Sequence, residues 1–165
     1  MDKKERMEEW FLRYAKDIKN FLIYYTNQSD VEDFVQECFL RAWKGFDRFA
    51  EKSDPKTWLI AIARNVAIDA ARKKALWRYL PAPLWKKIKS NAPALETSLI
   101  LQEEMQELYR AIHQLKRSYR DVVILRGIME LSVEETARIL DWSETKVSVT
   151  FHRALAKLRT QKKGE

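Results

Sequence analysis

Apolar residues recur every three or four positions through most of this chain, and this spacing constrains its fold more than any other feature. Residues 31–46 show it most regularly, with apolar side chains at Val31, Phe34, Val35, Cys38, Phe39, Ala42, Trp43 and Phe46. A helix with this pattern has one apolar face that other helices must cover. Only 3 glycines and 4 prolines occur in 165 residues, which disfavours a turn-rich β architecture. We therefore predict an all-α fold.

Polar residues mark the boundary between the first two predicted helices. Residues 4–26 keep the apolar spacing and are predicted to form the first helix. Ser29 and Glu32 stand three residues apart, as in a capping box, where each side chain bonds the backbone N–H of the other residue. This pair predicts the start of the second helix, and Gly45 predicts its end.

The third predicted helix has a specific start signal and an apolar side. Asp54 precedes Pro55, and this pair is typical of a helix start. The Asp54 carboxylate can cap the helix, and proline fits the first helical position because the backbone N–H there has no partner within the helix. The helix is expected to run to about Ala75. Its apolar side carries Trp58, Leu59, Ile62, Ala63 and Val66. Three helices joined by short loops predict a compact bundle over residues 1–75.

The opposite side of this helix is suited to nucleic acid. It carries Arg64, Asn65, Asp69, Arg72 and Lys73. Asparagine can pair with a base edge, and arginine or lysine can bind phosphate. Asp69 would repel phosphate, so we expect it to orient a neighbouring arginine or asparagine. A helix on a membrane surface would also be basic and amphipathic, but here the apolar side continues the core stripe of its neighbours.

Residues 76–94 differ from the segments on either side. Pro81, Pro83 and Pro93 forbid a long helix, so the segment is predicted to be a flexible linker between two small helical domains. Its apolar residues have two interpretations that remain open. They lie on a partner, or they pack back on the chain's own domains.

The last part of the chain, residues 95–165, predicts a helix-turn-helix. A helix is expected over 119–129, and Ser132 with Glu135 predicts a capping box at the start of the next, short helix. Asp141 stands where that helix must end and tolerates a left-handed cap. The final helix has six basic residues and no acid over 146–163. A plain helical hairpin with a basic exterior is the alternative.

Composition narrows the class of protein. The net charge of +7 and the pI near 9.5 favour an anionic partner. The single cysteine, Cys38, excludes an intramolecular disulfide and a cysteine-rich zinc site. No signal peptide or membrane-spanning segment is predicted, so we expect a cytoplasmic protein without membrane insertion.

An enzyme that acts on nucleic acid is disfavoured. His113 and His152 lie far apart in sequence, and neither a carboxylate cluster with metal-ligand spacing nor a phosphate-binding glycine loop is evident. We therefore expect no catalytic residues, metal, cofactor or small-molecule substrate.

Two long motifs resemble a known family. One part of the chain resembles region 2 of bacterial sigma factors, namely DFVQECFLRAWKGFDRF followed by TWLIAIARNVAIDAARKK. A later part resembles region 4, namely LKRSYRDVVILRGIMELSVEETARIL followed by HRALAKLR. The short chain, with only a linker between the motifs, resembles the extracytoplasmic-function group. The resemblance implies region 2 over 1–75, a linker over 76–94 and region 4 over 95–165. It also implies a bacterial protein that binds the β and β′ subunits of core RNA polymerase and directs the polymerase to specific promoters.

The resemblance assigns roles to three sets of residues. In the family, the second helix binds the clamp helices of β′, which implies polymerase binding by Asp33, Gln36, Glu37, Leu40, Arg41, Trp43 and Lys44. The family's next loop captures a flipped base of the minus-10 element, and the third helix reads and holds this element. The implied minus-10 residues are Phe49, Lys52, Arg64, Asn65, Asp69, Arg72 and Lys73. The implied minus-35 residues are Lys146, Ser148, Val149, His152 and Arg153, with phosphate contacts from Arg120 and Arg126.

The sequence departs from the family at one point. Many members have basic residues where this chain has Ser148 and Thr150. We therefore expect minus-35 binding to rely on Lys146, His152 and Arg153, and to favour a different sequence. The family also implies an anti-sigma factor as a partner.

A stand-alone helix-turn-helix regulator, with the first bundle as a dimerisation or sensor module, is the alternative function. The Asp33–Arg41 side distinguishes the two, because only a sigma factor needs it for polymerase.

Overall fold

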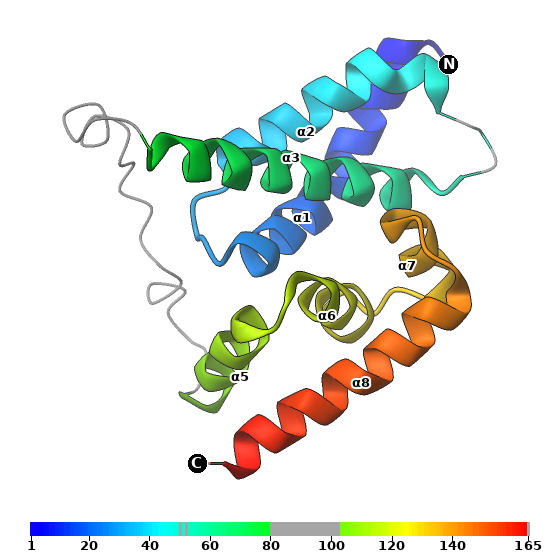
Figure 1. The fold of residues 1–165 in the computed structure, drawn as a ribbon. Helices are drawn as coiled ribbons and strands as arrows, with labels where there is room; N and C mark the ends of the chain where they lie inside the picture. Colours follow the sequence, from blue (N-terminus) through cyan, green and yellow to red (C-terminus); the bar gives the residue numbers. More distant parts are fainter. Residues whose placement is uncertain (50, 52, 80–102, 165) are drawn as a thin grey trace. The chain divides into compact units, whose positions relative to one another are not determined.

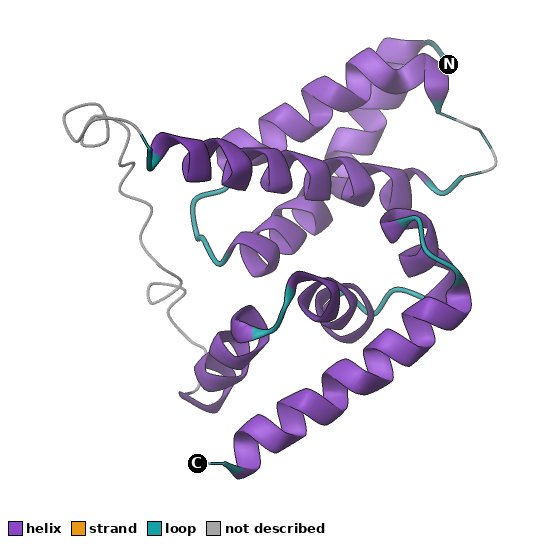
Figure 2. Cartoon of the chain, in the orientation of Figure 1, coloured by secondary structure: helices purple, strands orange, loops and turns teal. Residues whose placement is uncertain are grey.

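The computed structural model describes residues 1–49, 51, 53–79 and 103–164. The chain consists of two compact units, Met1–Thr97 and Ser98–Glu165. The described residues form helices and connecting loops, and no strand occurs among them (Figure 2). The predicted all-α fold is therefore confirmed. Most of the predicted linker, residues 80–94, lies outside the described residues.

The described residues of the first unit form a bundle of three long helices (Figure 1). They are α1 (Lys3–Thr26), α2 (Glu32–Gly45) and α3 (Pro55–Trp77), with a short 3-10 helix, η1 (Phe46–Arg48), after α2. Each of the three long helices contacts the other two. Their shared core contains the fully buried side chains Ile18, Phe21, Leu22, Val31, Leu59 and Ile60.

Local capping signals fix two helix starts in this unit. The Asp54 carboxylate caps α3 by accepting hydrogen bonds from the Thr57 N–H and hydroxyl group, each at 3.1 Å, as the sequence predicted. At the start of α1, Asp2 and Glu5 form a capping box that sequence reasoning missed. α1 ends at Asn27, which adopts the left-handed conformation with φ of 56°.

The predicted capping box at Ser29 and Glu32 is wrong. α2 begins at Glu32, with Val31 as N-cap residue and no side-chain capping bond. The Glu32 carboxylate instead accepts a hydrogen bond at 2.7 Å from Lys19 on α1, which raises the pKa of Lys19. Val31 is 1% exposed, so burial in the core places the start of α2.

Residues 103–164 of the second unit form five consecutive helical segments. They are α5 (Glu103–Gln114), α6 (Arg117–Val122), a π-helical segment η3 (Val123–Ile128), α7 (Val133–Leu140) and α8 (Glu144–Lys163). The helix predicted over 119–129 is therefore α6 continued by η3. The Met129 N–H donates to the Ile124 carbonyl five residues earlier at 2.9 Å, which is the π-helical spacing.

The predicted helix-turn-helix is present in α7 and α8. The Ser132 hydroxyl accepts from the Glu135 N–H at 3.0 Å, and the Glu135 carboxylate accepts from the Ser132 N–H at 2.7 Å. Asp141 ends α7 in the left-handed conformation, with φ of 56°. The Ser143 hydroxyl then caps α8. Both the predicted capping box and the predicted left-handed cap are confirmed.

Candidate functional site

The outer side of α2 combines charged and apolar side chains. Asp33, Gln36, Leu40, Trp43 and Lys44 are exposed, and Glu37 and Arg41 are half-buried. Leu40 is 48% exposed and Trp43 is 41% exposed, although Trp43 belongs to the apolar stripe predicted for this helix. Large apolar side chains on a surface that is otherwise polar are typical of a protein interface.

An apolar groove adjoins this side of α2. Its volume is about 480 Å³, and it is lined by Lys4, Met7, Glu8, Phe11, Leu12, Phe39 and Trp43. Leu12 is 85% exposed and Phe11 is 47% exposed. The α1 side chains in the groove were missed at the sequence level. Leu12 was the available signal, because it stands outside the buried stripe of α1. The groove extends the α2 surface onto α1.

The polar side of α3 is arranged as the helical spacing predicted. Asn65, Arg72 and Lys73 are exposed, and Arg64 and Asp69 are half-buried. Lys52, which was assigned to the same set, lies outside the described residues. This side of α3 therefore presents an amide and two cations to solvent.

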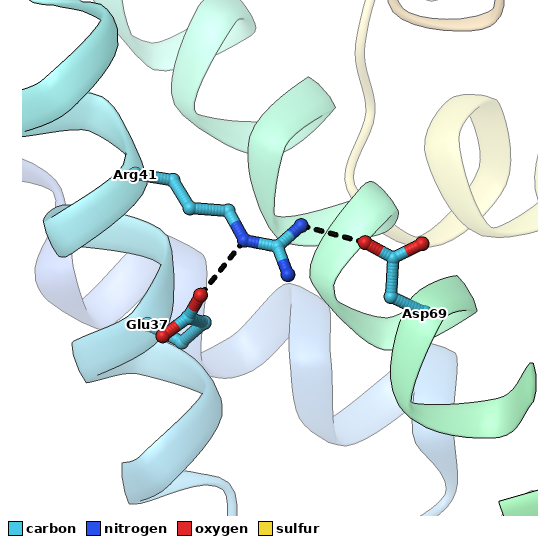
Figure 3. A network of polar contacts seen from close by, with 3 residues as sticks. All are labelled: Glu37, Arg41 and Asp69. Atoms are coloured by element: carbon cyan, nitrogen blue, oxygen red, sulfur yellow. Dashed lines mark hydrogen bonds and ion pairs between the residues drawn. The ribbon is translucent and has the colours of Figure 1, made fainter. Parts of the chain in front are cut away.

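Asp69 bonds to α2 and not to a neighbour on its own helix. Its Oδ2 accepts a hydrogen bond from Arg41 Nη1 at 2.8 Å, and Arg41 Nε donates to Glu37 Oε1 at 2.9 Å (Figure 3). The hydrogen bond to Glu37 raises the pKa of Arg41 most, and the hydrogen bond to Asp69 raises it further. Asp69 orients an arginine, as expected, but the arginine belongs to the neighbouring helix. The residues assigned to polymerase and to the minus-10 element thus meet in one network.

Phe49 points into the bundle. Its ring centroid lies 5.0 Å from that of Trp10 and 5.0 Å from that of Trp58. Residues on either side of Phe49 in the sequence form ion pairs with α1. Asp47 pairs with Lys3 at 3.6 Å, and Glu51 pairs with Arg6 at 3.5 Å. Phe49 is therefore held against α1 and α3, and its half-buried ring is not presented freely to a base.

The outer side of α8 carries the five residues assigned to the minus-35 element. Lys146, Ser148, Val149, His152 and Arg153 are all exposed. The opposite side is held in the core by Val147 and Ala154, both 0% exposed. The Lys146 ammonium group lies 4.2 Å from the centroid of the Trp142 ring, a cation–π contact that keeps this cation near the turn.

The two arginines assigned to phosphate are used inside the second unit. Arg126 Nη1 donates to the Leu131 carbonyl, and its guanidinium lies 5.4 Å from the centroid of the Phe151 ring. Arg120 lies beside the buried carboxylate of Asp121 at 4.0 Å. These contacts favour a structural role for both arginines.

The described residues contain neither a membrane-spanning helix nor a metal-binding cluster. None of the helices there has the length and apolar character needed to cross a bilayer. The same part of the chain brings no three histidine, cysteine or acidic side chains together in a way that would hold a metal ion.

Comparison with family models matches both units. The model of Sigma-70 region 2 matches residues 10–76, and the model of Sigma-70, region 4 matches residues 105–158. The first match covers α2, nearly all of α3 and most of α1, and the second covers α7 and most of α8.

Relatives of known identity match most of the chain. The ECF RNA polymerase sigma factor SigX of Bacillus subtilis (strain 168) is 36% identical, over 93% of this chain and 84% of the relative. The ECF RNA polymerase sigma-E factor of Escherichia coli (strain K12) is 30% identical, over 79% of this chain and 72% of the relative.

Solved structures share the fold. The sigma factor RpoE of Bartonella quintana, in complex with the anti-sigma factor NepR, superposes with a TM-score of 0.76 at 23% identity, covering 96% of this chain and 98% of that chain. CnrH, in complex with the cytosolic domain of CnrY, gives a TM-score of 0.70 at 22% identity, covering 98% and 90%.

Proposed function

Because this chain belongs to the extracytoplasmic-function group of RNA polymerase sigma factors, we propose that it binds core RNA polymerase and directs it to specific promoters. The observation that carries this proposal is the order of the two matched regions on one chain, each with an exposed surface suited to its role. The protein acts in the bacterial cytoplasm and performs no chemistry itself, since the polymerase supplies the active site.

The outer side of α2 is the surface for polymerase. Its exposed Leu40 and Trp43 supply apolar anchors, and the acidic and basic side chains around them set the orientation of the partner. An elongated apolar surface with a charged rim suits a partner helix, such as one of the β′ clamp helices. The α1 residues of the adjoining groove extend the area available for docking.

The polar side of α3 contacts the minus-10 element. Asn65 offers both a donor and an acceptor to a base edge, whereas Arg72 and Lys73 bind phosphate. Phe49 supports this surface indirectly, because its ring packs against Trp10 on α1 and Trp58 on α3.

The outer side of α8 enters the major groove at the minus-35 element. Lys146, His152 and Arg153 are the exposed residues able to donate to base edges or phosphates. Val149 is 42% exposed and offers an apolar contact to a thymine methyl group. Ser148 adds an exposed hydroxyl group to this surface.

An anti-sigma factor is the proposed regulatory partner. The two solved relatives named above were determined as complexes, one with an anti-sigma factor. The apolar groove between α1 and α2 supports such a partner here, since its exposed Phe11 and Leu12 suit an amphipathic helix. A partner in this groove would lie against Trp43 and compete with polymerase.

A paired substitution on exposed leucines tests the polymerase surface. Leu40→Ala should weaken binding of the labelled chain to core polymerase about tenfold, because truncating an apolar anchor costs about 1–2 kcal/mol. Leu76→Ala is the control, since Leu76 is 69% exposed but stands at the end of α3. The dissociation constant of the Leu76→Ala variant for core polymerase should stay within about twofold of that of the unmodified chain. Equal binding by both variants would contradict the assignment of α2.

A second pair of variants tests the DNA surface. Asn65→Ala and Arg72→Ala should impair promoter opening and leave the affinity for core polymerase unchanged. Loss of polymerase binding instead would show that the sides of α3 are assigned wrongly.

A further inference from the structure

Asp69 is an acidic residue on a helix side that otherwise carries an amide and cations. A free carboxylate there would repel the phosphates that Arg72 and Lys73 are proposed to bind. The structure gives this carboxylate a cation from another helix, because Arg41 Nη1 donates to its Oδ2 at 2.8 Å (Figure 3). Its charge is therefore partly offset before any DNA arrives, because Arg41 is shared with the Glu37 carboxylate.

The consequence for Arg41 is a fixed side chain. The guanidinium is planar, and two of its three nitrogens are bonded, Nε to Glu37 on the same helix and Nη1 to Asp69 on α3. Two anchors on different helices hold the long side chain in one rotamer. Within the described residues Nη2 makes no hydrogen bond, so its donors remain for a partner.

A fixed arginine binds a partner better than a mobile one. Arginine has many rotamers, and ordering them on binding reduces affinity. Arg41 lies on the side of α2 proposed for polymerase, and its side chain is 34% exposed. Its orientation is thus set in advance by a residue on the DNA-binding helix.

The same pair is not needed to hold the two helices together. α2 and α3 pack against each other, and both carry fully or nearly fully buried side chains, among them Val35, Cys38, Ala42, Leu59 and Ala63. The Cys38 thiol also donates to the Leu59 carbonyl at 3.4 Å. The Asp69 side chain is 42% exposed, and ion pairs at such exposure contribute little to stability. The effect of losing the pair should therefore appear in binding.

We propose that Asp69 is a positioning residue for polymerase binding, which acts by fixing Arg41, and that it is not a contact to promoter DNA. The proposal rests on the proposed function as a sigma factor. Through the Asp69–Arg41 bond, α3 fixes one side chain of the surface that binds polymerase, and the same helix contacts the minus-10 element.

The test is a double-mutant cycle on polymerase affinity. Labelled full-length chains carrying Asp69→Asn, Arg41→Ala or both substitutions are titrated with core polymerase at a temperature where circular dichroism shows each to be folded. Asp69→Asn should raise the dissociation constant about three- to tenfold in the unmodified chain. It should have no further effect in the Arg41→Ala background, because its action passes through Arg41.

Asp17→Asn provides a matched control. Asp17 also makes an ion pair with α3, at 3.9 Å to Lys56, and its side chain is 41% exposed. This variant should bind polymerase as the unmodified chain does. A general effect of losing an interhelical ion pair would weaken both variants equally, and would overturn the positioning role.

A second readout separates positioning from DNA contact. Holoenzymes formed at saturating polymerase are compared on promoters that differ at single minus-10 bases. Asp69→Asn should leave the ranking of these promoters unchanged. A changed ranking, an unchanged polymerase affinity or an additive effect with Arg41→Ala would each overturn the proposal.

The same titrations distinguish failure of the proposed sigma-factor function from failure of the positioning role of Asp69. If the unmodified chain does not bind core polymerase, the proposed function and this inference both fail. If it binds but Asp69→Asn binds equally well, only the inference fails.

Discussion

Replacing Phe49 by alanine should destabilise the first unit by about 2 kcal/mol. Truncating a fully buried phenylalanine to alanine lowers the free energy of unfolding by about 3–5 kcal/mol. The ring of Phe49 is half-buried, so the loss should be smaller. Its two aromatic partners, Trp10 and Trp58, stand 5.0 Å away between ring centroids. Each such pair contributes about 0.5–1.5 kcal/mol beyond area burial, which keeps the estimate near 2 kcal/mol despite the partial exposure.

Urea denaturation followed by circular dichroism and tryptophan fluorescence measures this loss. The transition midpoint should fall while the slope stays the same. Phe11→Ala is the matched control, because Phe11 is 47% exposed and makes one ring contact, with Phe39. It should lose about 1 kcal/mol or less. If Phe49→Ala stayed within about 0.5 kcal/mol of the unmodified chain, the ring would behave as a free surface residue, and the anchoring role would be refuted.

Three further predictions concern helix caps and the buried thiol. Asp54→Ala should lower the free energy of unfolding by about 1 kcal/mol, since it removes the hydrogen bonds to Thr57, whereas an unchanged melting temperature would contradict this. Ser132→Ala should destabilise the second unit by a similar amount, seen in thermal melts, and leave polymerase binding by the first unit intact. Burial raises the pKa of the Cys38 thiol from 9.0 to about 12. The unfolded chain therefore loses this proton first, and stability should fall as pH rises from about 9 toward 12. A Cys38→Ala variant should show a shallower fall over the same range, and an identical slope would contradict the assignment.

The helix ends that depend on neighbouring residues could be predicted from the sequence. Asp54, Ser132 and Asp141 act on backbone groups within about four positions, so the sequence contains both partners of each interaction. The exposed side of α8 follows from helical spacing once its start is known. These features need no knowledge of how the helices pack.

The features that depend on packing could not be predicted. Glu32 bonds Lys19 on another helix, and this contact replaces the capping box that spacing predicted with Ser29. Asp69 bonds Arg41, 28 positions away, so its partner appears only when α2 and α3 are placed together. The inward position of Phe49 likewise requires Trp10, which lies on a different helix.

Transcription with purified components tests the central proposal most directly. Core RNA polymerase is combined with this chain and a library of promoter fragments, and the start sites of the transcripts are mapped. We expect transcripts that begin at defined positions on a subset of fragments and that require both the chain and the polymerase. No start-site-specific transcript, together with tight and specific binding of duplex DNA by the chain alone, would contradict the proposal and favour a stand-alone regulator.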